Sequence, residues 1–186
     1  QLMCGKLIVW IFAMRILMIL TSLGAYFIND KISAALYKNS KDFDAEKPLT
    51  HLVWLTSLIS VAVTFVASYV LLPPSEYKGL WWILSVIISC GTMAGALIPE
   101  FTKVFTSTNS RHVKEVVTSS KQGGASLDIL SGFVAGNFSA FWEGLLIMAL
   151  MAISYLMSQQ PDMLAVLPEG LAFAAPIFAF GLVAFG

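Results

Sequence analysis

Long apolar runs separated by polar connections dominate this chain of 186 residues. A helix needs about 20 mostly apolar residues to cross the hydrocarbon core of a bilayer. Five runs reach or approach that length, and they cover residues 7–28, 52–72, 80–105, 127–157 and 170–186. Each run is predicted to be helical, because unpaired backbone groups are not tolerated in lipid. The fourth run is longer than a span requires, so we expect that helix to tilt or to project from the bilayer.

The composition supports lipid as the main solvent of the chain. Apolar residues make up 58% of it and charged residues only 12%, with a mean hydropathy of +0.80. Soluble domains carry about 25% charged residues. The predicted fold class is therefore all-α, a polytopic transmembrane helix bundle. The chain begins with Gln1 and its fifth run is incomplete at Gly186, so we expect residues 1–186 to form one transmembrane fragment of a longer protein.

Basic residues predict how the spans are oriented. Lysine and arginine gather in the connections 29–51 and 106–126, whereas the other two connections carry one basic residue or none. The positive-inside rule then places these two connections in the cytoplasm. Trp10, Trp54 and the pair Trp81-Trp82 lie near span ends, as tryptophans of an interfacial belt do.

Three spans contain small residues at a spacing of four residues, which places them on one helix face. Small residues let transmembrane helices approach closely, so we interpret these faces as helix-packing surfaces. The alternative is a face that slides or lines a pathway. The glycines and alanine of this kind are Gly91, Gly95, Gly132, Gly136, Ala140 and Gly144, and the hydroxyl counterparts are Ser60, Thr64 and Ser68.

Three charged residues lie inside predicted spans. Arg15 and Glu143 fall near the middle of the first and fourth spans, and Glu100 follows Pro99 near the cytoplasmic end of the third. A charge at the bilayer centre costs about 2.5–3.5 kcal/mol on insertion scales, so such groups usually find partners. Our hypothesis is a structural ion pair between Arg15 and Glu143. A place on an ion path and contact with a partner subunit are the alternatives.

The connection before the fourth span carries a turn signal. Gly123-Gly124 marks a sharp turn, and it matches neither of the glycine-rich phosphate-loop patterns. Ser126 is a plausible N-cap for the helix that follows. Asp128 would then lie in the first turn, where a carboxylate interacts favourably with the helix dipole.

The sequence offers no constellation for catalysis. His51 and His112 lie in different connections, and Cys4 and Cys90 form no metal-ligand pattern. We find neither a nucleophile with a base nor paired carboxylates of the kind that hold metal ions and phosphate. We therefore assign no catalytic, cofactor-binding or metal-binding residue, and we expect no nucleic-acid partner.

Residues 112–136, HVKEVVTSSKQGGASLDILSGFVAG, resemble a segment of the membrane-bound, ion-pumping pyrophosphatases. In that family a PVK motif and a small, polar run precede N-x-I-x-G-x-x-V-G at the start of a helix. The residues that fit are Val113, Lys114, Ser119, Gly123, Ala125, Ile129, Gly132 and Gly136. Residues 98–116 and 178–186 resemble further family segments. Many members have Leu-Glu-Ser where this chain has Asn137-Phe138-Ser139.

The resemblance implies a place and a function for the five runs. They would be the seventh to eleventh spans of a sixteen-helix subunit in a prokaryotic cell membrane. The whole protein would couple hydrolysis of inorganic pyrophosphate to transport of H⁺ or Na⁺ out of the cytoplasm. It would use Mg²⁺ bound outside this fragment, would be activated by K⁺ in some members, and would form a homodimer.

The same resemblance makes this segment mainly an outer-ring scaffold, because the family's catalytic residues lie on other helices. The fragment alone is therefore expected to be inactive. A secondary transporter without hydrolytic activity is the alternative, since small-residue faces, a proline and buried charges suit that class as well. A structural membrane subunit without its own activity is a third interpretation.

Overall fold

The computed structural model describes residues 2–37, 46–73 and 79–165, and this part of the chain is helical without strands. The prediction of an all-α bundle is confirmed. The fifth predicted span, residues 170–186, lies outside the described residues. The five helices are α1 Leu2–Tyr37, α2 Glu46–Leu71, α3 Leu80–Thr106, α4 Arg111–Ser158 and the single turn α5 Pro161–Leu164.

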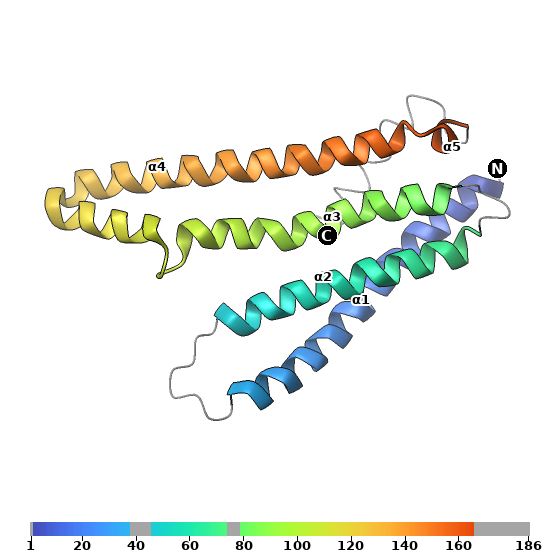
Figure 1. Cartoon of the computed structure of the whole chain (residues 1–186), viewed down its shortest axis with the longest axis horizontal. Helices are drawn as coiled ribbons and strands as arrows, with labels where there is room; N and C mark the ends of the chain where they lie inside the picture. The colour runs from blue at the N-terminus through green and yellow to red at the C-terminus, as the bar shows by residue number, and fades with distance from the viewer. Residues whose placement is uncertain (1, 38–45, 74–78, 166–186) are drawn as a thin grey trace.

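Each long helix packs on the next one along the chain, and α3 lies between α2 and α4 (Figure 1). α2 and α4 lie on opposite sides of α3, whereas α1 crosses α2, so that Trp10 and Met14 of α1 share a buried cluster with residues of α3. Three stretches are long and apolar enough to cross a membrane: Gly5–Ala35, Glu46–Leu71 and Leu80–Ser158, the last of which contains both α3 and α4. Large apolar side chains remain exposed along all of these helices, as lipid-facing helices require.

The seam between α1 and α2 is built on hydroxyl groups. Trp10 Nε1 donates to Ser68 Oγ over 3.0 Å, and the hydroxyls of Thr21 and Ser60 lie 3.3 Å apart. Thr64 Oγ1 donates to the carbonyl of Ser60 in its own helix over 2.7 Å. The packing prediction for this face is confirmed. Trp10 is only 3% exposed, so its indole packs between helices rather than facing lipid.

The helices run further into the connections than the sequence predicted. Instead of a loop at 29–51, α1 continues to Tyr37 and α2 already begins at Glu46. Instead of a loop at 106–126, only residues 107–110 separate α3 from α4. Ser110 caps the start of α4 at Arg111, because its Oγ accepts from the backbone N–H of His112 over 3.2 Å. The N-cap role of Ser126 concerns the helix after Gly124 and stays a prediction. An Arg111–Glu115 pair at 3.1 Å supports this first stretch of helix.

The predicted turn at Gly123-Gly124 is confirmed, and it divides α4 into two arms. Gly124 has φ 65° and ψ −153°, a conformation that is essentially restricted to glycine. The N-terminal arm, residues 111–123, folds back along the main arm, residues 125–158 (Figure 1). The main arm is about 51 Å long at 1.5 Å per residue. A hydrocarbon core is about 30 Å thick, so this helix extends past a single span when it stands upright.

Candidate functional site

Polar side chains from three helices meet around the last turns of α3. We call this cluster the α3 polar end. It links α3 to α2 on one side and to α4 on the other. Its members are Glu46 and Thr50 of α2, Thr102 and Lys103 of α3, the α3 C-cap Ser107, and Ser139 and Glu143 of α4.

The contacts with α2 tie the start of one helix to the end of the next. Lys103 Nζ donates to Thr50 Oγ1 over 2.8 Å and lies 4.0 Å from Glu46 Oε2. Ser107 Oγ donates to the same carboxylate over 3.0 and 3.1 Å. Because both charged side chains are about one third exposed or more, this ion pair adds at most about 1 kcal/mol to stability.

The contacts with α4 place a carboxyl group inside a helix seam. Thr102 Oγ1 donates to Glu143 Oε1 over 2.7 Å, and Ser139 Oγ donates to the same oxygen over 3.0 Å. Thr102 Oγ1 also lies 2.9 Å from the carbonyl oxygen of Ile98. Glu143 is partly buried and is level with the penultimate turn of α3, not with its middle.

The hypothesis of an Arg15–Glu143 ion pair is wrong for the described residues. Glu143 makes its hydrogen bonds with Thr102 and Ser139. Arg15 lies on α1 and borders a groove of about 450 Å³ together with Thr92, Gly95 and hydroxyl groups of α2. The reason is topological, because α1 packs on α2 whereas α4 packs on the opposite side of α3.

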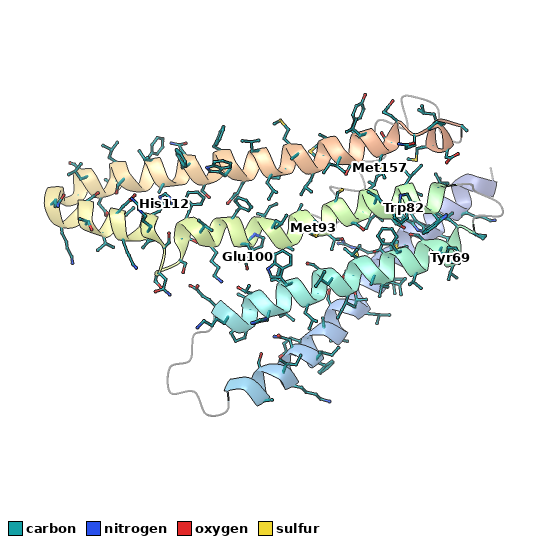
Figure 2. The ribbon with its side chains drawn as sticks, in the orientation of Figure 1. Tyr69, Trp82, Met93, Glu100, His112 and Met157 are labelled. Carbon is teal, nitrogen blue, oxygen red and sulfur yellow. The ribbon has the colours of Figure 1, made fainter. Side chains whose placement is uncertain are left out.

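Glu100 lies close to the α3 polar end. With Pro99 and Thr106 it lines a groove of about 430 Å³ between α2 and α3. Figure 2 labels Glu100 on the length of α3 that runs beside α2. Pro99 is exposed, and α3 continues through it as one helix from Leu80 to Thr106. Glu100 therefore stays near polar neighbours, as its position beside the cytoplasmic connection suggested.

The small residues separate into a buried and an open group. Gly91 is buried within α3, while Gly95 borders the groove beside Arg15. The α4 stripe, which consists of Gly132, Gly136, Ala140 and Gly144, is exposed throughout. A Cβ built on any of its three glycines would meet no atom within 4 Å. The stripe thus packs against no helix among α1–α5, and its role as a packing surface stays a prediction.

The sequence interpretation missed the threonine and the lysine of the α3 polar end. Thr102 and Lys103 carried no motif, and their importance follows only from which helix faces each of them. Ser139 had been noted because it lies one turn before Glu143. Within the described ranges no group of three or more His, Cys, Asp or Glu side chains is placed to hold a metal ion. His112 stacks on Phe105 with ring centroids 4.8 Å apart.

Comparisons with known proteins identify the same family as the sequence resemblance did. The family model described as inorganic H⁺ pyrophosphatase matches residues 2–186. The K⁺-insensitive pyrophosphate-energized proton pump of Chlorobaculum tepidum is 49% identical to this chain over 182 residues. That alignment covers 97% of this chain and 23% of the length of the pump. No solved structure matches the chain.

Proposed function

Because this chain belongs to the inorganic H⁺ pyrophosphatase family, we propose that the full-length protein hydrolyses pyrophosphate and moves protons out of the cytoplasm. One observation carries the proposal, which is the 49% identity over nearly the whole chain to a pyrophosphate-energized proton pump. The described helices suit an integral, multi-pass membrane protein. The chain spans about a quarter of the relative's length, so most of the machinery lies elsewhere.

The segment described here serves the pump mainly as a scaffold. Pyrophosphate hydrolysis needs metal ions that polarise phosphoryl oxygens and activate water. Such metal ions require several carboxylates together, and the described part of the chain gathers no such group. We expect Mg²⁺ and pyrophosphate to bind outside the described residues, and two full-length copies to associate as a homodimer.

The proposal extends to the ion and to the cofactor requirement. The relative is named as a proton pump and as K⁺-insensitive, which favours H⁺ over Na⁺ and activity without K⁺. The transporter alternative is not favoured, because the matched relative is energised by pyrophosphate. A structural subunit without activity is not favoured for the same reason.

Membrane vesicles that contain the full-length protein provide the test. Pyrophosphate and Mg²⁺ should release phosphate and acidify the vesicle lumen, and equal rates are expected with and without K⁺. Replacing Na⁺ by choline should leave acidification unchanged if protons are the ion pumped. Absence of phosphate release under all of these conditions would overturn the enzyme assignment. Residues 1–186 expressed alone should be inactive, and hydrolysis by them would place the active site inside this segment.

A further inference from the structure

We propose that residues 170–186, the fifth apolar run, pack as an antiparallel transmembrane helix on the open side of the last turns of α4. We call this docking surface the α4 C-terminal face. The proposal concerns how the chain assembles, and it does not rest on the proposed pumping function. The members of the face are Phe141, Gly144, Leu145, Met148, Ala152, Tyr155 and Leu156.

The α4 C-terminal face is open among the described helices. Its residues recur at intervals of three to four, which places them on one side of the helix. All of them are exposed, Met148 and Leu156 to 62% and 64%. The other side of the same turns packs on α3, where Ile147, Leu150 and Met151 contact a buried cluster. The face is therefore available to a helix outside the described residues.

The position of α5 limits where the fifth run begins. Met163 is fully buried in a cluster with Leu72 and Leu80, where all four long helices meet. Five residue steps separate Ala165 from Gly170, and they span at most about 18 Å. Because packed helices lie about 8–10 Å apart, the run begins beside the helix ends of this cluster. It then crosses the bilayer in the direction opposite to α4.

The open sides of the helices at this end differ in side-chain size. α3 is mostly buried over Leu80–Ala96, so little of its surface is left for a further helix. The open sides of α1 and α2 carry large residues such as Phe12 and Val66. The open side of α4 includes Gly144 and Ala152, and small residues allow transmembrane helices to approach closely. α4 also directly precedes the run, and consecutive elements are usually neighbours.

The fifth run carries a small face that matches the α4 C-terminal face. Intervals of three and four residues alternate along both, as they do where two helices pack side by side. Large side chains of α4 can therefore enter between small residues of the run. The alternating positions of the run are Ala172, Ala175, Ala179, Leu182 and Gly186, and those of α4 are Phe141, Leu145, Met148, Ala152 and Tyr155.

The length of the run sets how much of α4 it covers. As a helix, residues 170–186 are about 25 Å long at 1.5 Å per residue. A start level with Ser158 brings the end of the run to the level of Phe141. Met148 then lies level with the turn that contains Ala179. The run thus covers the α4 C-terminal face but ends before Gly136.

Photo-crosslinking of the full-length protein in membranes tests the occupant of the face. p-Benzoylphenylalanine in place of Met148 should cross-link to a peptide within residues 170–186, which mass spectrometry identifies. The same replacement at Ile153 is the control, because that residue is 47% exposed but points about 140° away around the helix. It should yield less of this product. The proposal is overturned if the Met148 product contains only lipid, a second copy or another helix, or if none forms.

Disulfide formation tests which side of the run meets α4. In the full-length protein, oxidation should link Met148→Cys to Ala179→Cys about tenfold faster than to Ile177→Cys, because a disulfide needs Cα atoms within about 7 Å. Ile177 is the control, since it lies on the opposite side of the same turn. The single variants show any disulfides that native cysteines form.

A change of register is covered by a third pair. Ala175→Cys lies one turn from Ala179 on the small face, so it reacts with Met148→Cys if the run is shifted by one turn. The proposal is overturned if neither position reacts faster than Ile177→Cys. Both kinds of cross-link form without pyrophosphate hydrolysis, so failure of the proposed function and failure of this inference are distinguishable.

Discussion

Two helices of this protein carry small residues at every fourth position, yet they use them in opposite ways. On α2, Ser60, Thr64 and Ser68 are 6%, 2% and 0% exposed, and they pack in the seam with α1. On α4, the stripe from Gly132 to Gly144 faces away from the other described helices. Spacing alone did not distinguish the two faces.

The two stripes differ in their hydrogen-bonding groups, because serine and threonine carry hydroxyls in their side chains and glycine has no side chain. A hydroxyl stripe carries its own donors and acceptors, and it needs a neighbour that can complete its hydrogen bonds. α1 supplies such a neighbour through Trp10 and Thr21. A glycine stripe gains only from close approach of another helix. The large residues around it, such as Ile129 at 73% exposure, are open as well. This face of α4 is thus left uncovered by the other described helices.

The largest effect is expected in the closed seam, which is the buried contact of α1 with Ser60, Thr64 and Ser68 of α2. Ser68→Leu adds bulk where the side chain has no exposed surface, and it removes the acceptor for Trp10. Overpacking together with the lost hydrogen bond should cost about 3 kcal/mol. Thermal unfolding of the full-length protein in detergent measures the loss. Val66→Leu, on the exposed side of the same helix, is the control and should change stability by less than about 0.5 kcal/mol.

A matched change on α4 tests the open face, which is the exposed stripe of Gly132, Gly136, Ala140 and Gly144. If a helix of the full-length protein covers the glycine stripe, Gly136→Leu should cost about 2 kcal/mol, because the bulk prevents close approach. Asn137→Leu, at the next exposed position, serves as the control in the same unfolding measurement. Equal stability of the two variants would mean that the stripe faces lipid, and the packing interpretation would then be wrong.

A smaller effect is expected at the turn that positions the open face. Gly124→Ala places a Cβ on a backbone conformation that is essentially restricted to glycine, which should cost of order 1 kcal/mol or more. Proteolysis between the two arms of α4 should accelerate as the turn loosens. Ser126→Ala, at an exposed position two residues later, should leave the cleavage rate unchanged. Unaltered proteolysis of the Gly124 variant would contradict the turn geometry.

The smallest effect concerns one hydrogen bond of the closed seam. Trp10→Phe keeps an aromatic ring in the core and removes the N–H that donates to Ser68. Hydrogen bonds between transmembrane helices average about 0.6 kcal/mol, so a loss of that size is expected in the same unfolding measurement. The double variant Trp10→Phe with Ser68→Ala tests the pairing. Strictly additive losses from the two single changes would show that the two side chains do not interact.

The sequence predicted the spans better than it predicted which residues meet. The start of α3 at Leu80 and the turn at Gly124 were both predicted, because apolar runs and paired glycines act locally. The partner of Glu143 was not, because it depends on the register between α3 and α4. The N-terminal arm carries the chain about 20 Å beyond α3 before it returns. Glu143 therefore comes level with the end of α3, although it lies near the middle of its own apolar run.

The predicted Arg15–Glu143 pair failed for a related reason. Similar depth in a bilayer brings two charges together only when their helices are neighbours. In this bundle each long helix packs mainly on the helix before it and the helix after it in the chain. Helix adjacency is set by the lengths of the connections and by faces such as the hydroxyl seam. Residue spacing within one helix does not encode that adjacency.

The length of the main arm of α4 makes it a lever. If the arm pivots at Ser158 as a rigid rod about 51 Å long, a tilt of about 10° moves Gly124 by roughly 9 Å. The same tilt moves Glu143, which is much closer to the pivot, by less than half that distance. A spectroscopic label beside Gly124 would therefore magnify movements that are small at the carboxyl group. A label at the turn between the two arms of α4 would thus report on movement at the contact between Glu143 and α3.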